Sequence, residues 1–353
     1  MFGRIPVFTM RITNAWKFIA VLMIFPSSSF ADEVKIYIWE EFLSEEVVQS
    51  FEQQTGHSVK QVYFENEILR DEVITNDRAE AFDLVMVDGL GLKLFGSKGL
   101  MYDLSQKPFA NKKFIDNSAI ETCGPYGIPY AWGTMGIAYR TSKIGHPIVS
   151  WKQVFSASSS MTDKIMIPYD DIDTIAAALL AKEHDPFTSD IIALTEAFEL
   201  LKEVAPKVKD FRNAVAYTIE NKQESDLELA VIYSGEVNTI IEETQQKDWV
   251  YIVPEEGTVL WYECFSTLAT KPPSVATIEF LNFINDPVIS AENAEEFQFS
   301  TTNEEALKHA SKEYLNDKNV FPGTDVLAHS FPYRVIDVKG LKIRSRILNA
   351  IEK

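Results

Sequence analysis

The fold is decided by the stretch Gly-Ile-Pro-Tyr-Ala-Trp-Gly-Thr-Met-Gly-Ile-Ala-Tyr, residues 127–139. Its β-branched and aromatic residues predict a strand, although it is much longer than the five or six residues that are usual. Gly133 and Gly136 interrupt it, and glycine inside a strand marks a bend or the close approach of another backbone. We therefore expect one long, bending strand that crosses from one lobe of the protein to another.

The residues before this stretch predict a β-α-β unit. Residues 34–39 alternate as a strand does, and a helix begins at Ser44, which is followed by two acidic residues, and ends at Gly56. Residues 58–64 predict the next strand, and the apolar run 83–87 is typical of a strand covered on both faces. Such units nearly always have a right-handed crossover.

The same alternation of short strands and longer helices continues after the long strand. Helices are expected at 175–180, 191–204 and 276–284, strands at 229–233 and 249–253, and a return crossing at 261–268. Single cores stop growing near about 250–300 residues, so a chain of this length should divide. We expect an α/β fold of two lobes, each a β-sheet flanked by helices, with lobe 1 at 32–137 and 263–310 and lobe 2 at 138–262 and 311–353.

The first 31 residues predict a signal peptide. Arg4, Arg11 and Lys17 precede an apolar run at 18–25, and small residues lead up to Ala31, after which we expect cleavage. The run is too short to span a bilayer, which takes about 20 residues. No cysteine follows the expected cleavage site, so we expect no lipid anchor but a soluble protein in the periplasm of a Gram-negative cell.

The charge of the chain argues against one class of partner. The net charge is −19, and the expected signal peptide holds three basic and no acidic residues, which leaves −22 on the rest. A field of that sign disfavours nucleic acid and favours a cationic ligand. Acidity that serves only solubility is the alternative interpretation.

The two cysteines and the missing enzyme motifs bound the chemistry further. Cys123 and Cys264 could pair in an oxidising compartment, or they could remain two buried thiols. They form no zinc pattern with the scattered histidines, and no calcium loop is present. Nucleophile elbows, His-Glu-x-x-His and phosphate-cradling loops are also absent from the sequence. We expect no catalytic residue, metal site or cofactor.

Six motifs in order resemble those of the periplasmic spermidine/putrescine-binding proteins. They are Trp-Glu-Glu-Phe at 39–42, Phe-Glu-Gln-Gln-Thr-Gly at 51–56, Phe-Asp-Leu-Val at 82–85, Ile-Pro-Tyr-Ala-Trp-Gly at 128–133, Glu-Gly-Thr-Val-Leu-Trp-Tyr-Glu at 256–263, and Leu-Asn-Phe-Ile-Asn-Asp-Pro at 281–287. The resemblance covers nearly all of the chain after the signal peptide. It implies the two-lobed, type II fold of periplasmic binding proteins, with the ligand cleft at the hinge.

Within this family the chain is most similar to norspermidine-sensing members. That similarity implies a monomer that binds norspermidine or spermidine and signals to the periplasmic domain of an inner-membrane cyclic di-GMP enzyme, which controls biofilm formation. The alternative is the substrate-binding subunit of an ABC importer, with a permease as its partner. A ligand of another class, such as an amino acid, would need an arginine for its carboxylate, and no arginine is assigned to the pocket.

The resemblance also implies which residues hold the amine. The aromatic walls and carboxylates expected in the site are Trp39, Glu40, Glu41, Phe42, Asp88, Asp170, Asp173, Tyr233, Trp261 and Glu263. Trp261 is expected to form the central wall, Glu263 to meet the inner ammonium, and Asp170 with Asp173 to hold a terminal one. Asp88 follows a strand whose carboxyl end is a usual place for ligands.

Each assignment has a structural alternative. A tryptophan near a strand end is usually core packing, and the acidic residues at 170–173 could be a solvated loop with a helix cap. Three positions depart from the family pattern: Asp88 stands in a segment that is Ser-Thr-Tyr in relatives, Tyr233 replaces a tryptophan, and Arg334 lies near an expected glutamine. An arginine that faces a polyamine would be unfavourable.

Overall fold

The computed structural model describes residues 1, 3, 31–64, 66–157 and 159–352. The expected signal peptide therefore lies almost entirely outside the described residues, and the chain from Asp32 onward forms a compact unit of its own. None of the helices in the described ranges is long and apolar enough to cross a membrane.

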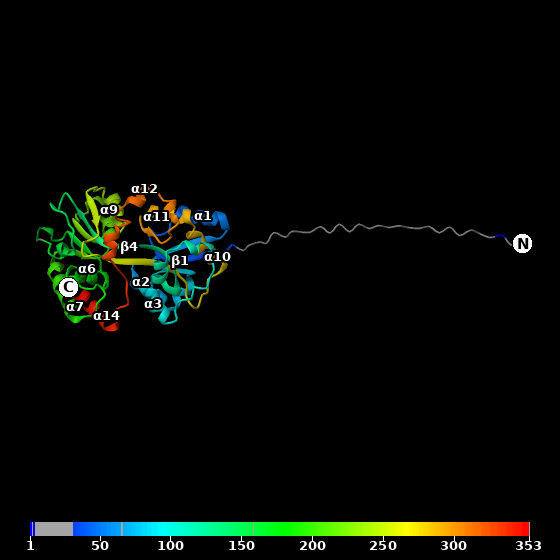
Figure 1. The fold of residues 1–353 in the computed structure, drawn as a ribbon, viewed down its shortest axis with the longest axis horizontal. Helices are drawn as coiled ribbons and strands as arrows, with labels where there is room; N and C mark the ends of the chain where they lie inside the picture. Colours follow the sequence, from blue (N-terminus) through cyan, green and yellow to red (C-terminus); the bar gives the residue numbers. More distant parts are fainter. Residues whose placement is uncertain (2, 4–30, 65, 158, 353) are drawn as a thin grey trace. The chain divides into compact units, whose positions relative to one another are not determined.

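One continuous path of strands organises this unit, in the order β2-β1-β3-β9-β4-β7-β5-β6 (Figure 1). The strands are β1 (Glu33–Trp39), β2 (Ser58–Phe64), β3 (Leu84–Asp88), β4 (Gly127–Arg140), β5 (Ile165–Ile167), β6 (Val208–Phe211), β7 (Leu229–Tyr233), β8 (Trp249–Ile252), β9 (Val259–Ser266), β10 (Ser300–Thr301) and β11 (Phe331–Pro332). β1 lies parallel to β2 and to β3. The predicted β-α-β unit is confirmed.

The long strand β4 connects the two halves of the path, as predicted. Residues 127–134 of β4 pair with the antiparallel strand β9, whereas residues 135–140 pair with β7 and β8. Figure 1 shows β4 and the yellow strand β9 between two groups of helices. Each end of β4 therefore belongs to a different half of the sheet path.

Helices pack around both halves. The α-helices are α1 (Glu45–Thr55), α2 (Glu67–Ile74), α3 (Gly89–Ser97), α4 (Asn117–Cys123), α5 (Trp151–Phe155), α6 (Asp173–Ala181), α7 (Ile191–Val204), α8 (Ala214–Asn221), α9 (Glu236–Thr244), α10 (Val275–Ile284), α11 (Pro287–Phe297), α12 (Lys312–Asn316), α13 (Thr324–Ala328) and α14 (Val338–Ile351). Helix α1 begins and ends at the residues predicted from the sequence. The Ser44 side chain accepts hydrogen bonds from the backbone N–H groups of Glu46 and Val47, and Gly56 ends the helix with a φ of 77°.

The hydrophobic core is divided in the way that two lobes require. One large cluster includes β1, β3 and the first part of β4, and we call its surroundings the first lobe. The other clusters include the second part of β4 with β5, β7, α6 and α7, and their surroundings are the second lobe. Some residues pack outside the lobe predicted for them: Tyr314 and Val320 lie in the first cluster, and Met135 and Ile137 lie in the second.

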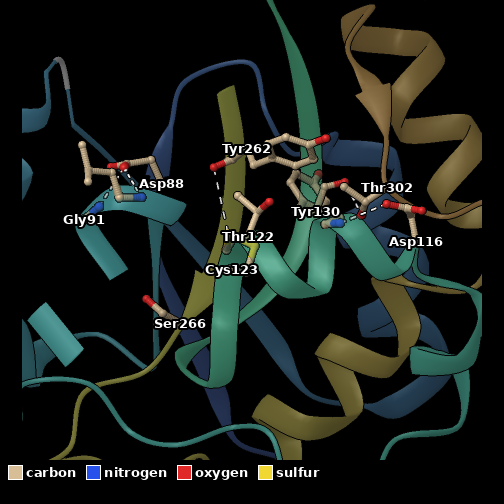
Figure 2. The surroundings of a disulfide bond; sticks show 12 residues. Asp88, Gly91, Asp116, Thr122, Cys123, Tyr130, Tyr262, Ser266 and Thr302 are labelled. Atoms are coloured by element: carbon tan, nitrogen blue, oxygen red, sulfur yellow. Dashed lines mark hydrogen bonds between the residues drawn. A yellow bond between two sulfur atoms is a disulfide. The ribbon is translucent and has the colours of Figure 1, made fainter. Parts of the chain in front are cut away.

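A disulfide joins Cys123, at the end of α4, to Cys264 in β9, with Cα atoms 6.1 Å apart (Figure 2). Of the two alternatives that the sequence left open, the structure has the bond. The cross-link closes a long loop, and such bonds typically contribute about 2–5 kcal/mol to stability. It fastens α4 to the strand that carries Trp261 and Glu263.

Candidate ligand-binding site

The carboxyl ends of two parallel strands form the first half of the site. Trp39 ends β1, and its indole N–H donates to Glu263 Oε1 over 2.9 Å. Asp88 ends β3 and lies opposite Glu263 in the antiparallel β3–β9 register. The indole ring of Trp39 also packs against Phe64, with ring centroids 4.3 Å apart. Three residues predicted for one side of the cleft, Trp39, Asp88 and Glu263, are thus brought together.

Glu263 is the least satisfied carboxylate of this group. Its side chain is only 6% exposed, and Oε2 has no hydrogen-bond partner within the described part of the chain. Burial raises its pKa to about 7, and the charge of Asp88 adds to the rise, while Arg70 and the Trp39 hydrogen bond oppose it. A buried acceptor without a partner is unfavourable, so a cationic donor at Oε2 would complete this site.

Arg70 is a member of the site that the sequence analysis missed. Its side chain is 1% exposed, and Nη2 lies 3.0 Å from Asp88 Oδ2 and 2.9 Å from Asp71 Oδ1. The guanidinium also lies 5.9 Å from the ring centroid of Phe64. The signal in the sequence was its spacing of four from the buried Ile74, which places Arg70 on the inward face of α2.

Asp88 has partners on both of its oxygens. Oδ1 accepts from the backbone N–H groups of Leu90 at 2.9 Å and Gly91 at 2.8 Å, which caps α3. Oδ2 accepts from Arg70 Nη2. The sequence placed Asp88 correctly at the strand end, but its contacts are those of a helix cap and an ion pair.

The second half of the site is built around Asp173, the first residue of α6. Tyr233 at the end of β7 donates to Asp173 Oδ2 over 2.5 Å, and Tyr333 donates to Oδ1. Burial raises the Asp173 pKa to about 7, with Asp170 adding to the rise, while the two phenol hydrogen bonds oppose it. Asp173 is buried, and its carboxylate is held from both sides by neutral donors.

The loop before α6 is fixed by its own backbone and by a second buried arginine. Asp170 Oδ1 accepts from the N–H groups of Ile172 at 2.7 Å and Asp173 at 2.6 Å, so Asp170 acts as a cap as well as a candidate ligand residue. Arg344 of α14 is fully buried and donates to the carbonyls of Ile172 and Pro186. Burial lowers the Arg344 pKa to about 10, and the attraction of the loop carboxylates opposes this change.

Carboxylates of the two lobes lie close enough to affect one another's charge. The pKa of Glu67 in α2 is raised by burial and further by Asp88, by Asp170 of the second lobe and by Glu263, against the effect of Arg70. The side chain of Glu67 is nevertheless 43% exposed. Solvent therefore reaches this carboxylate although Arg70 and several acidic groups lie near it.

Like charges also face each other at the rim of the cleft. The pKa of Glu41 is raised by burial, by its neighbour Glu40, and by Glu242 and Glu243 of α9 in the second lobe. Glu41 has a φ of 60°, a left-handed conformation that is uncommon outside glycine.

Phe42 and Trp261 form an aromatic wall beside the first half. Their ring centroids lie 6.3 Å apart, and Phe42 stacks on Phe299 at 5.5 Å. The Trp261 indole nitrogen is buried and has no hydrogen-bond partner in the described ranges. A Cβ on Gly133 would lie 2.3 Å from Trp261 Cζ2, so the glycine in the crossing strand is what lets the indole pack there.

Comparison with known proteins identifies the family. Residues 46–322 match the family model of the bacterial extracellular solute-binding proteins. The chain belongs to this family. It is 27% identical over 319 residues to the norspermidine sensor of Vibrio cholerae, an alignment that covers 90% of this chain and 88% of the relative. It is 24% identical to the spermidine/putrescine-binding periplasmic protein 1 of Haemophilus influenzae, with 85% and 83% covered.

The solved structures confirm the predicted fold class. A putative spermidine/putrescine ABC transporter protein from Listeria monocytogenes superposes with a TM-score of 0.79 at 21% identity, covering 91% of this chain and 98% of that one. The predicted two-lobed α/β fold of periplasmic binding proteins is therefore correct. At this identity the likeness shows the fold alone, so the ligand has to be argued from the site.

Arg334, which lies near the position where a glutamine was expected, forms an exposed ion pair. Arg334 Nη2 lies 2.5 Å from Asp185 Oδ1, and both side chains are about half exposed. Its guanidinium stacks over Phe187 at 5.6 Å. Arg70, and not Arg334, is the arginine that contacts the candidate ligand carboxylates. No group of three His, Cys, Asp or Glu side chains suited to a metal ion occurs among the described residues.

Proposed function

We propose that this chain is a periplasmic polyamine-binding protein, and that it senses norspermidine or spermidine. The observation that carries the proposal is Glu263 Oε2, which lies beside Trp39 and has no hydrogen-bond partner among the described residues. We expect Asp173 of the second lobe to lie across the ligand from it. An ammonium near Oε2 would supply the missing donor, and the next ammonium along a flexible chain would reach the carboxylate of the other lobe.

The remaining surfaces suit the methylene segments of such a ligand. Trp39 and Trp261 offer flat apolar faces next to Glu263, which lies two residues after Trp261 on the same face of β9. Each buried methylene contributes about 0.8 kcal/mol, and each cation–π contact adds about 0.5–2 kcal/mol. The carboxylates decide where the charges lie, while the rings stabilise the chain between them.

Closure of the two lobes on the ligand is the mechanism that the geometry supports. A ligand shifts the balance between open and closed forms only by its difference in affinity for the two. Because the carboxylates of the two lobes raise one another's pKa, they repel each other when no cation lies between them. A polyamine would reverse that repulsion and favour the closed form by hinge motion.

The main experiment is a thermal-shift and calorimetric panel on residues 32–353. The ligands are putrescine, cadaverine, norspermidine, spermidine and spermine, with glutamate and arginine as controls. Stabilisation by the triamines and none by the amino acids is expected. Binding of amino acids with no response to any amine would contradict the proposal, and turnover of any amine would contradict our proposal that the chain binds without catalysis.

The partner that receives the signal is proposed from the similarity to the norspermidine sensor. We propose the periplasmic domain of an inner-membrane cyclic di-GMP enzyme that controls biofilm formation. The alternative is an ABC permease, which the similarity to the Haemophilus influenzae protein favours. Crosslinking of the purified chain to each partner, with and without norspermidine, separates the two, because ligand-dependent capture is expected for only one of them.

A further inference from the structure

The carboxylates near the cleft differ in whether they are free to meet a ligand. Asp88 has partners on both oxygens, two backbone N–H groups and Arg70. Asp170 likewise caps the start of α6. Glu263 Oε2 has no hydrogen-bond partner among the described residues. Asp173 has a donor on each oxygen, but both donors are neutral phenols, and Glu67 contacts a cation with one oxygen only, over 3.5 Å.

Glu67 is held at the first position of α2 by a helix cap. The Asn66 side chain accepts from the Leu69 N–H over 2.9 Å, which fixes where the helix begins. The carboxylate of Glu67 takes part in no hydrogen bond with the described residues, and its Oε1 lies 3.5 Å from Arg70 Nη1. Nη1 is itself buried without a hydrogen-bond acceptor in the part of the chain that the structure describes.

A chain of contacts links Glu67 to Glu263 through Arg70 and Asp88. Arg70 reaches Glu67 with Nη1 and Asp88 with Nη2, and Asp88 lies opposite Glu263 in the strand register. Glu263 accepts from Trp39.

A second set of contacts, through the ring of Phe64, connects Glu263 and Trp39 back to Arg70. Trp39 packs on Phe64, and Phe64 lies under the guanidinium of Arg70. Because every link is a direct contact or a register pair, Glu67 lies at the same end of the cleft as Glu263.

We propose that Glu67 supplies the second ligand carboxylate of the first lobe, the role predicted for Asp88. Asp88 is held on both oxygens, by Arg70 over 3.0 Å and by the α3 backbone, whereas Glu67 contacts the same guanidinium with one oxygen only, over 3.5 Å. The inference rests on the proposed polyamine function. Three carboxylates, those of Glu67, Glu263 and Asp173, would then meet the three ammonium groups of a triamine. A diamine can be held by two of the three, so it depends less on Glu67.

The test is Glu67→Gln with norspermidine and putrescine in calorimetry. Loss of one charge-assisted contact predicts a norspermidine affinity about tenfold weaker, with a loss of about threefold or less for putrescine. Glu72→Gln is the matched control, because it lies on the same helix, is exposed and removes the same charge. It should change either affinity by less than about twofold. The melting temperatures of both variants without ligand should stay close to that of the unmodified chain, because Arg70 keeps its nearer partners Asp71 and Asp88 when Glu67 loses its charge.

The outcomes separate this inference from the proposed function. If the unmodified chain binds norspermidine and Glu67→Gln behaves like Glu72→Gln, the assignment of Glu67 is overturned while the polyamine proposal stands. If the unmodified chain binds none of the amines, both are overturned. A tenfold loss confined to Glu67→Gln, with an unchanged melting temperature, supports the assignment.

Discussion

The two halves of the cleft present their carboxylates in different ways. In the first lobe the buried guanidinium of Arg70 contacts Asp88 directly, and one oxygen of Glu263 has no hydrogen-bond partner among the residues that the structure describes. In the second lobe two phenols donate to both oxygens of Asp173, while the buried guanidinium of Arg344 binds backbone carbonyls beneath it. The second half is therefore organised before the ligand arrives, whereas the first half has an acceptor that only a ligand or water can satisfy.

The largest expected effect concerns the arginine of the first half. Arg70→Met removes the only positive partner that the described contacts give Asp88. Removing one partner of a buried ion pair typically costs about 3 kcal/mol or more. Urea unfolding should therefore show a loss of that size. Arg334→Met, which breaks an exposed pair with Asp185, is the control and should cost less than about 1 kcal/mol. Equal losses would show that Arg70 is not structurally different from a surface arginine.

Each half of the site has a carboxyl group with a raised pKa, and the dependence of amine affinity on pH tests whether both groups take part in binding. The pKa values of Glu263 and Asp173 are both raised to about 7, so each is partly protonated at neutral pH. A bound ammonium favours the ionised forms, and binding should release protons. Norspermidine affinity should rise between pH 6 and pH 8, by up to about tenfold for each group. Calorimetry in buffers of different ionisation enthalpy measures the released protons, and a flat affinity profile would contradict the shared role.

The stability of the ligand-free chain should change with pH in the opposite direction. A carboxyl whose pKa is higher in the folded than in the unfolded state makes the folded state bind more protons. The contribution of Glu263 is therefore present below its ordinary pKa of 4.5 and is lost as the pH rises through about 7. Asp173 behaves in the same way from 3.8. These two groups alone make the empty chain less stable at pH 8 than at pH 5, while the gain from ligand grows.

Much of the fold could be predicted from the sequence because its signals are local. The spacing of apolar residues, Ser44 and Gly56 predicted α1, and the composition of residues 127–139 predicted β4. The lobe boundary near residue 311 stays a prediction, although Tyr314 and Val320 pack in the first cluster, which no local pattern reveals.

The site was predictable only where a strand end or a family motif marked it. Glu263, Trp39 and Asp173 were predicted in this way; Trp39 contacts Glu263, and Tyr233 contacts Asp173, while their role in ligand binding stays a prediction. Arg70 and Glu67 were missed because their importance depends on contacts that α2 makes far along the chain, above all that of Arg70 with Asp88 at the end of β3. Asp88 was placed correctly, but the competition for its oxygens by Arg70 and the α3 backbone appears only in three dimensions.

The aromatic wall of the first half gives the next prediction. The indole ring of Trp261 packs against Phe42 and occupies the space beside Gly133, and Trp261→Ala removes this ring. The loss of apolar contact and of a cation–π face predicts an amine affinity more than about tenfold weaker. Trp261→Phe keeps part of the ring and should lose less. Calorimetric affinity that is unchanged in Trp261→Ala would remove this residue from the site.

The smallest expected effect is a change in the preference for triamines over diamines, which tests whether Glu263 binds the inner ammonium group. Glu263→Gln keeps an acceptor for the Trp39 indole but removes the charge next to the unpartnered position. A triamine, whose inner ammonium we assign to Glu263, should lose about fivefold more affinity than a diamine, which has no inner charge. Competition between norspermidine and putrescine on the same variant measures this ratio directly. Equal losses for both amines would mean that Glu263 meets a terminal ammonium, and the inner charge would then have to lie nearer Asp173, the half of the cleft that is already organised.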